Sequence, residues 1–281
     1  MEACKNASPA DTPQLGVVGR AGSTAAFHLI RWDPSPAAAE FVEHLWSVRW
    51  SLRDGETHDS TVITFPVMHL THEWGDPGDD APRHGYPLPT TLVHGVVQTV
   101  FHTTLRRSGT VVGARFHPGG FAARFHRDAS DFTGQTLPVD DALFGARLQV
   151  DDDRERAATQ LDQAIAAHRG APDPTYLALR ALLEGVRGDA GVRRVEQVMD
   201  RAPWSARTTQ RVFRRYVGVP VKWVLCRYRL QRAALDLEIE PGVDLADLAV
   251  RHGWYDQAHF SHDFRAMLGC APGEYVAQNG P

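Results

Sequence analysis

The stretch "GWYDQAHFSHDFRAMLG", residues 253–269, has phenylalanines at helical spacing and two histidines three residues apart. It belongs to the second copy of a repeat. "VRRVEQVMDRAPWSARTTQRVFRRYVG" from Val192 and "VDLADLAVRHGWYDQAHFSHDFRAMLG" from Val243 align without a gap. Each copy predicts a helix, a short turn, an N-cap at Ser205 or Asp256, and a second helix that ends at a glycine. This pattern is typical of a helix-turn-helix, so the sequence predicts two of them.

The second helix of each copy has an apolar back and a polar front when residues are placed at 100° intervals. In the first copy the back is Thr209, Val212, Phe213 and Tyr216, and the front is Arg207, Gln210, Arg211 and Arg214. Arginine can bond guanine O6 and N7, and glutamine can bond adenine N6 and N7, so this front suits the major groove of DNA. In the second copy the back is Phe260, Phe264 and Met267, and the front is Ala258, Ser261, His262 and Arg265 with Gln257 at its edge. Two ordinary amphipathic surface helices are the alternative interpretation.

The net charge of −4 conceals a strong asymmetry between the two copies. Residues 192–232 hold eleven Lys or Arg and two acids, for a local net charge of +9. Residues 233–281 hold two Arg against eight acids, for a net charge of −6. Such runs often mark only a solvated face. Combined with the arginine front, they predict that the first copy makes the stronger contact with phosphates.

Three stretches resemble the AraC/XylS family of bacterial transcription regulators over about residues 173–275. They are "SARTTQRVFRRYVGVPVKWVLCRYRLQRA", "DLADLAVRHGW" and "DQAHFSHDFRAMLGCAPGEY". A weaker resemblance links two further stretches to a less characterised N-terminal domain that is often fused to the DNA-binding domain of this family. These stretches are "LWSVRWSLRDG" and "VVGARFHPGGFAARF". The chain departs from the family at Trp254, His262 and Pro220-Val221, where the family commonly has Phe, Arg and Ser-Pro. The change at His262 predicts that the second copy binds DNA more weakly than the first.

The resemblance implies a set of residues that face DNA. The base-facing residues are Arg207, Gln210, Arg211, Gln257, Ala258, Ser261 and His262. We expect phosphate contacts from Arg193, Arg194, Arg214, Arg215, Lys222 and Arg265. A joining helix from about Val221 to Leu237 would span ~26 Å. It would hold both recognition helices in major-groove segments about 34 Å apart, one turn of duplex.

The chain length of 281 residues favours two domains. Residues 1–25 read as a flexible terminus. Alternating strands and turn signals in 26–138 predict an antiparallel β-rich sensor or dimerisation domain, cupin-like or related. We expect residues 139–172 to form a helical connector and, from the resemblance, residues 173–281 to form an AraC-type DNA-binding domain. The predicted fold class is therefore α+β, with an antiparallel β domain followed by an all-α domain that holds two helix-turn-helix units.

Ten of the fourteen histidines precede residue 127, which raises the question of a metal site. His69 and His72 lie three apart on a predicted strand and should point to opposite faces, and no cysteine is near them. His259 and His262 are likewise not expected to be a metal pair. We therefore predict no metal and no cofactor. A set of aromatics either lines a ligand pocket or forms an ordinary core: Trp46, Trp50, Phe65, Trp74, Phe101 and Phe116.

The expected class is a DNA-binding regulator and not an enzyme. The alternatives are a DNA-tethered metal-dependent enzyme and a DNA-repair methyl acceptor, but Cys4, Cys226 and Cys270 lack the neighbours that activate a cysteine. No nucleophile elbow, phosphate loop or paired-carboxylate motif is present.

The expected partners are double-stranded operator DNA and RNA polymerase. A small-molecule effector at the N-terminal domain and a homodimer remain open, and so does the role of "DRERAATQLDQAIAAH", which serves either as a dimer contact or as packing for its own domain. The start lacks a secretory signal and no run of about 18 apolar residues occurs, so we expect no membrane partner and a cytoplasmic, nucleoid-associated protein.

Overall fold

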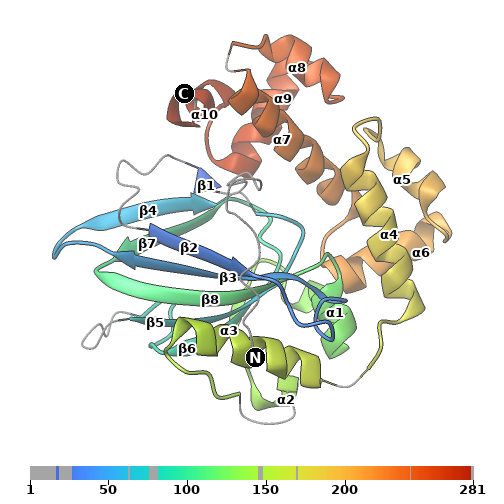
Figure 1. The fold of residues 1–281 in the computed structure, drawn as a ribbon. Coiled ribbons are helices and arrows are strands. Elements are labelled where there is room, and N and C mark those ends of the chain that lie inside the picture. The colour runs from blue at the N-terminus through green and yellow to red at the C-terminus, as the bar shows by residue number, and fades with distance from the viewer. Residues whose placement is uncertain are drawn as a thin grey trace.

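A computed structural model describes residues 17–18, 27–62, 64–75, 82–144, 148–168, 170–240 and 242–279 (Figure 1). It confirms the predicted α+β class, because an antiparallel β domain precedes an all-helical region. Most of the predicted flexible terminus, including Cys4, lies outside the described residues. None of the described helices combines the length and the apolar character needed to cross a bilayer.

The β domain consists of two antiparallel sheets, one above the other in Figure 1. The larger sheet has the order β2 (Phe27–Trp32), β3 (Val42–Ser51), β8 (Ser108–Phe116), β5 (His69–Gly75), β6 (Thr90–His94) and β9 (Thr136–Pro138). The smaller sheet has the order β1 (Val17–Val18), β4 (Thr57–Val62) and β7 (Phe101–Arg106). The sheets face one another, since the Phe101 ring of β7 lies 6.3 Å from the His94 ring of β6.

Two tight turns carry the chain between the sheets. The predicted Asp54-Gly55 turn is present, with Gly55 at φ 81°, but it leads from β3 of the larger sheet to β4 of the smaller one. Arg107, at φ 47°, marks the return from β7 to β8. The backbone N–H of Leu52 donates to the Arg107 carbonyl at 2.6 Å, which joins the two crossings. These turns therefore close one end of the two-sheet structure.

Helix α3 (Arg154–Ala167) covers the outer face of the larger sheet and packs on β3 and β8 (Figure 1). Buried apolar residues on both sides form this contact: Leu45, Leu70, Val112, Ala114, Ala157, Leu161 and Ile165. Arg124 of α1 (Gly120–Phe125) donates to the carbonyls of Ile165, Ala166 and Gly170 at 2.7–2.8 Å, and so caps the C-terminal end of α3. Of the two roles left open for this helix, the structure shows packing on its own domain.

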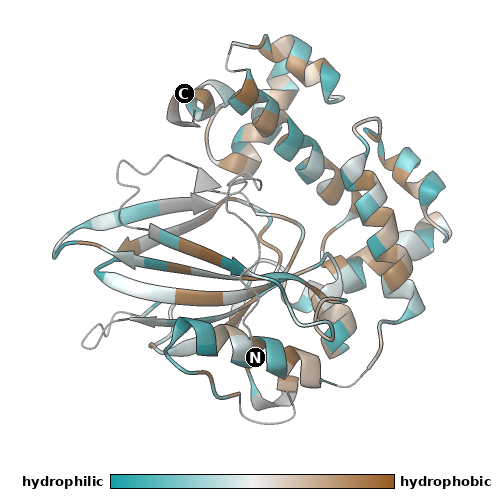
Figure 2. Ribbon diagram, viewed as in Figure 1, coloured by the Kyte–Doolittle hydropathy of each residue, from teal (hydrophilic) through white to brown (hydrophobic). Residues whose placement is uncertain are grey.

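The helical region holds two pairs of helices at the two ends of a long helix, α7 (Val221–Ile239) (Figure 1). The first pair is α5 (Val195–Arg201) with α6 (Ala206–Val212), and α6 continues into a π-helical segment, η3 (Phe213–Val217). The second pair is α8 (Leu245–Arg251) with α9 (Gln257–Leu268). Helices α4 (Pro174–Gly188) and α10 (Pro272–Asn279) flank the two pairs. Figure 2 shows hydrophobic and hydrophilic bands alternating along α4 and α7, as expected for helices with one buried face.

One hydrophobic core runs from the β domain into the first helix pair without a break. The Phe41 ring stacks on Tyr176 of α4 with centroids 5.7 Å apart, and the Tyr176 hydroxyl donates to the Glu40 carbonyl at 2.7 Å. The hydroxyl of Tyr216, in η3, lies 3.0 Å from both carboxylate oxygens of Asp173 at the start of α4. The β domain and the first pair are therefore packed as one body.

Gly218 lies at the closest point of this junction. Its φ of 86° is left-handed, and its carbonyl accepts a hydrogen bond from Thr133 at 2.8 Å. A Cβ at this position would lie 2.8 Å from the Ala129 carbonyl oxygen of the 3-10 helix η2 (Ala129–Asp131). Only glycine combines this conformation with this approach.

We predict that Gly218→Ala lowers the free energy of unfolding by about 2 kcal/mol or more, because left-handed strain adds to the clash with the Ala129 carbonyl. Chemical denaturation of the full chain measures this change. Gly185→Ala is the matched control, since Gly185 lies in α4 and a Cβ there would meet nothing within 4 Å. The control should gain about 0.5–1 kcal/mol. Equal effects in the two variants would contradict the tight junction.

Candidate nucleic-acid interface

The second helix of the first pair begins and ends at the predicted residues, and its predicted apolar side is the buried side. The Ser205 hydroxyl accepts the backbone N–H of Thr208 at 3.3 Å at its start, and Gly218 ends it. The predicted back is buried in full: Thr209, Val212, Phe213 and Tyr216. The one polar member, Thr209, donates its hydroxyl to the Ser205 carbonyl at 3.1 Å, so its burial leaves no unsatisfied group.

The front of this helix is open to solvent. Arg207, Gln210 and Arg211 are exposed, and so are the predicted phosphate contacts of this segment, Arg193, Arg194, Arg214, Arg215 and Lys222. Within the described part of the chain, no acidic side chain forms an ion pair with Arg207, Arg211 or Arg214. These cations are therefore available to an anionic partner.

The second helix of the second pair presents a smaller front. Asp256 accepts the backbone N–H of His259 at 2.7 Å at the start of α9, and Gly269, at φ 81°, ends it. The back is confirmed, with Phe260 and Phe264 buried and Met267 partly buried. On the front, Gln257, Ala258, His262 and Arg265 are exposed and Ser261 is half-buried. Arg265 also lies 3.9 Å from Glu274, which reduces the positive charge of this front.

Helix α7 holds the two pairs through two separate cores. Val221, Val224, Leu225 and Tyr228 belong to the core that the first pair shares with the β domain. Leu230, Ala233, Ala234 and Leu237 belong to the core of the second pair. The helix ends at Ile239, two residues beyond the predicted end, and its nineteen residues span ~28 Å. Its length therefore sets the separation of the two pairs.

Three of the eleven basic residues in 192–232 point inward, so the sequence count overstates the exposed charge. Arg227 donates to the Met267 carbonyl at 3.1 Å, Arg229 to the His252 carbonyl at 2.7 Å, and Arg232 to the Asp189 carbonyl at 2.8 Å. These guanidinium groups satisfy backbone carbonyls. A further one, Arg201, pairs with Asp189 at 2.7 Å. The residues predicted to face DNA are not among these four.

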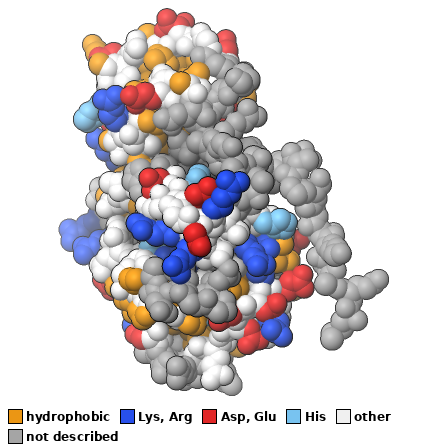
Figure 3. Space-filling model, turned by 90° about the vertical axis from the view of Figure 1, so that its left-hand side faces the viewer, with side chains coloured by type: hydrophobic (Ala, Val, Ile, Leu, Met, Phe, Trp, Pro, Cys, Tyr) orange, Lys and Arg blue, Asp and Glu red, His pale blue; other side chains and the backbone are white. Residues whose placement is uncertain are grey.

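On the β domain the charges are mixed. Seen from the left-hand side of Figure 1, acidic, basic and histidine side chains lie interspersed over the described part of that face, without a patch of one sign (Figure 3). This face of the β domain therefore differs from the front of α6, where arginines cluster.

Two family models match separate parts of the chain, one in the β domain and one in the helical region. A model of a helix-turn-helix domain matches residues 198–278, and a domain of unknown function (DUF6597) matches residues 30–138. Over 81 residues the chain is 30% identical to YkgA of Escherichia coli strain K12, whose name places it among HTH-type transcriptional regulators. Over 66 residues it is 35% identical to AarP of Providencia stuartii, an HTH-type transcriptional activator.

Residues 198–278 are an AraC-type helix-turn-helix domain. The matches cover 29% of this chain and 34% of YkgA, and 24% of this chain and 48% of AarP. The chain thus spans about a third of one curated relative and about half of the other.

Among solved structures, ToxT from Vibrio cholerae aligns with 91% of this chain and 100% of its own at 9% identity and a TM-score of 0.41. The C-terminal domain of AraT, a response regulator from Geobacillus stearothermophilus, aligns with 39% of this chain and 88% of its own at 20% identity and a TM-score of 0.34. Both scores lie below 0.5, and the assignment does not rest on them.

Asp263 gives a reason for Trp254 in the AraC-type domain. The Trp254 indole N–H donates to Asp263 Oδ2 at 2.9 Å, a bond that phenylalanine cannot form. The same oxygen lies 3.5 Å from His259 Nε2 and accepts the Cys226 thiol at 3.6 Å. His259 therefore pairs across one helical turn with Asp263, and His262 points elsewhere into solvent.

The two described cysteines have no activated thiolate. Burial raises the pKa of Cys226 to about 12, with a further contribution from Asp263, and burial also raises the pKa of Cys270. Both are protonated at neutral pH. A methyl acceptor requires a thiol with a lowered pKa, so neither fits that role.

His69 and His72 point to opposite faces of β5, as the strand alternation predicts. His69 Nδ1 accepts the Trp46 indole N–H at 3.3 Å on the face toward the smaller sheet. His72 Nε2 lies 3.1 Å from Asp152 on the other face, where α3 packs. These two histidines therefore share no site.

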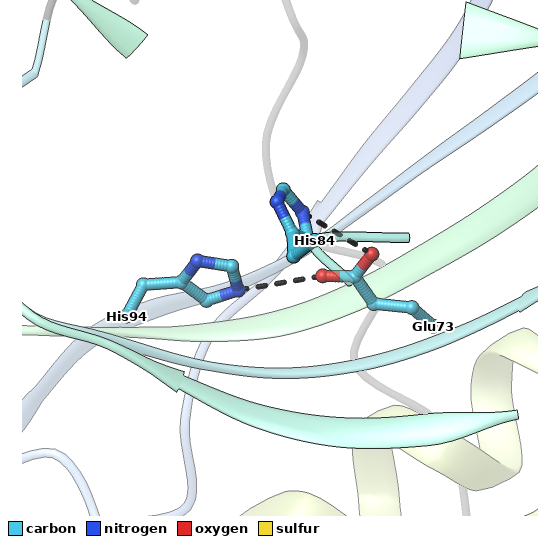
Figure 4. A group of neighbouring side chains, drawn as sticks. All are labelled: Glu73, His84 and His94. Carbon is cyan, nitrogen blue, oxygen red and sulfur yellow. Dashed lines mark ion pairs between the residues drawn. The ribbon is translucent and has the colours of Figure 1, made fainter. Parts of the chain in front are cut away.

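A histidine-carboxylate cluster that the sequence did not predict lies on the inner face of the larger sheet (Figure 4). Glu73 Oε1 lies 3.3 Å from His94 Nε2, and Glu73 Oε2 lies 3.6 Å from His84 Nε2. Burial raises the pKa of Glu73, but the His94 hydrogen bond and the charges of His84, His94 and Arg83 outweigh this and hold the pKa at about 2. Burial lowers the pKa of His84. The cluster therefore places an ionised carboxylate beside two imidazoles.

The sequence carried only part of the signal for this cluster. Strand alternation places Glu73 on the face opposite His72, but the pairing of β5 with β6 decides that His94 lies across from His69 on the same face. From there the His94 side chain reaches Glu73. His84 lies outside the strands, at φ 53°, in the segment between β5 and β6. Sequence spacing does not determine where such a residue points.

We predict that Asp263→Ala lowers the free energy of unfolding by about 1–3 kcal/mol, because it leaves the buried Trp254 indole N–H without an acceptor. Asp263→Asn, which keeps an oxygen acceptor, should cost less. Chemical denaturation measures both changes. In a Trp254→Phe background the further cost of Asp263→Ala should shrink, and an unchanged cost would show that the indole bond is unimportant.

Proposed function

We propose that this protein is a sequence-specific DNA-binding transcriptional regulator whose two helix-turn-helix units read successive major-groove segments. The observation that carries the proposal is the exposed front of α6, with Arg207, Gln210 and Arg211 opposite a fully buried back in an AraC-type domain. An arginine-glutamine face on a recognition helix matches the donors and acceptors of guanine and adenine in the major groove. Operator DNA is the partner that fits this surface.

The two pairs contribute unequally in this proposal. Arg207, Gln210 and Arg211 of α6, and Gln257, Ala258, Ser261 and His262 of α9, face bases. Arg193, Arg194, Arg214, Arg215, Lys222 and Arg265 contact phosphates, which set the affinity and the salt dependence. Helix α7 holds the two recognition helices for groove segments about 34 Å apart. The unpaired arginines of α6 support a stronger first contact than the α9 front.

The remaining parts of the proposal concern the N-terminal domain and the cell. We expect the β-rich domain, residues 26–138, to act as a sensor for an effector or as a dimer contact, joined by the connector 139–172 to the DNA-binding domain 173–281. We expect RNA polymerase as a second partner and a location on the nucleoid in the cytoplasm. The shared core between the β domain and the first helix pair supports communication between sensor and reader.

We predict that Arg211→Ala weakens binding to the natural operator by about 1–3 kcal/mol and relaxes specificity at one position, because a bidentate base contact is lost. His262→Ala should cost less. Binding isotherms on the operator identified by genomic footprinting measure both. Arg49→Ala, on an exposed strand residue of the β domain, is the matched control and should leave affinity unchanged. Equal losses at Arg211 and His262 would contradict the asymmetry between the two pairs.

We also predict a steep salt dependence. If the proposed phosphate set makes ~6 contacts, log affinity should fall with log salt with a slope near −5. Replacing Arg214 by Ala should reduce that slope by about 1 and weaken binding to all sequences alike. Titrations at four salt concentrations measure the slope. A flat response would remove the basic front from the proposal.

A further inference from the structure

The inner face of the larger sheet carries polar groups where a sandwich interior is normally apolar. Thr71 and Glu73 of β5 and His94 of β6 are all buried, and His84 approaches them from the segment between the two strands (Figure 4). The outer face of the same sheet holds a conventional apolar contact with α3. Burying a carboxylate and two imidazoles together is costly unless the groups do something for one another or for a ligand.

The atoms that face one another are the ones that bind metals. Both imidazoles present Nε2, one toward each oxygen of the Glu73 carboxylate, at 3.3 and 3.6 Å. Nitrogen and oxygen ligands lie about 2.0–2.2 Å from a bound zinc ion, so two ligands of one ion lie up to about 4.2 Å apart. The ligand atoms of Glu73, His84 and His94 all lie within 4.8 Å of one another. Small side-chain rotations therefore bring all three onto one ion.

The neighbours of the cluster hold these atoms in place. His94 Nδ1 lies 3.2 Å from the Thr136 hydroxyl, a contact that orients the ring. His94 Nε2 lies 2.9 Å from the Thr71 hydroxyl, and an ion on Nε2 would replace this contact. The Thr71 hydroxyl donates to Glu73 Oε1 at 2.9 Å, which orients the carboxylate. Metal-binding histidines and carboxylates typically have partners of this kind.

We propose that Glu73, His84 and His94 bind a divalent transition-metal ion of the kind that prefers imidazole and carboxylate ligands, such as Zn²⁺ or Co²⁺. Three protein ligands leave further coordination positions for water or another small ligand. Any proton on His94 Nε2 or His84 Nε2 leaves to solvent as the ion binds, because a coordinating imidazole is neutral. The site lies in the β domain, and its existence does not depend on the DNA-binding proposal.

Arg83 provides a further test of the proposal, because its positive charge repels a cation bound at Glu73. Its Nη1 lies 3.4 Å from Glu73 Oε2, yet the guanidinium also stacks over the Trp50 ring at 4.6 Å and lies 3.5 Å from the Trp74 and Thr110 carbonyls. It is therefore held in place by several groups besides Glu73. Removing its charge should raise metal affinity, which a purely structural role of the cluster does not predict.

The test uses the full chain, stripped with a chelator and titrated with ZnCl₂ and, separately, CoCl₂. We expect one equivalent of either metal to bind, seen by calorimetry and by visible Co²⁺ absorption, and this binding to be lost in Glu73→Gln, His84→Asn and His94→Gln. His72→Gln is the matched control, because His72 is a buried histidine on the same strand that faces the other side. It should keep the one-equivalent binding, and so should His259→Ala.

Arg83→Met should bind Zn²⁺ about tenfold more tightly than the natural chain. Circular dichroism checks that each variant is folded. His84→Asn is decisive if a buried variant fails to fold, because His84 is only partly buried and asparagine tolerates its left-handed backbone. The absence of one-equivalent binding to the natural chain would overturn the proposal. Unchanged binding in folded His84→Asn would also overturn it.

Discussion

At Gly218 the end of η3 packs tightly against the β domain. The Thr133 hydroxyl bonds the Gly218 carbonyl, and the space beside Ala129 admits no side chain at that point. Because η3 packs on the β domain here, the preceding helix α6 is held in place by the β domain as well as by α5. The two parts touch directly here, so a rearrangement of the β domain near Ala129 would act directly on η3 and on α6 before it.

Helix α7 extends this coupling to the second helix pair. Its first half lies in the core shared with the β domain and its second half in the core of the second pair. Arg227 stands at the boundary, buried, and bonds the Met267 carbonyl of α9 on one side and the Thr64 hydroxyl and Thr99 carbonyl of the β domain on the other. Burial lowers its pKa to about 10, so it remains charged at neutral pH. One buried cation therefore connects the end of α9 to loops of the β domain.

The two faces of the larger sheet differ in polarity. The outer face is apolar and closed by α3, whose C-terminal carbonyls are capped by Arg124. The inner face brings together Trp46, His69, Thr71, Glu73 and His94. Of the N-terminal aromatics, Phe116 lies in the core and Trp46 lies among polar groups of the inner face. The apolar contact with α3 and the polar cluster thus lie on opposite faces of one sheet.

The sequence by itself determined the features that depend on local periodicity and capping. The helix ends at Ser205, Gly218, Asp256 and Gly269, and the buried backs of α6 and α9, follow from residues close together in the chain. These signals are strong because a cap or a helical face involves neighbours within a few residues.

Only the tertiary structure decided what depends on contacts between distant residues. Arg211 of α6 and Arg227 of α7 lie in the same basic segment, yet Arg227 is buried against carbonyls and Arg211 is exposed. Packing, and not local charge, selects which side of each helix faces inward. Glu73, His84 and His94 meet because β5 pairs with β6 in one register and because the backbone at His84 directs its side chain toward them. The register cannot be predicted from residue spacing along the chain, and a slip of one residue would have turned Glu73 to the other face.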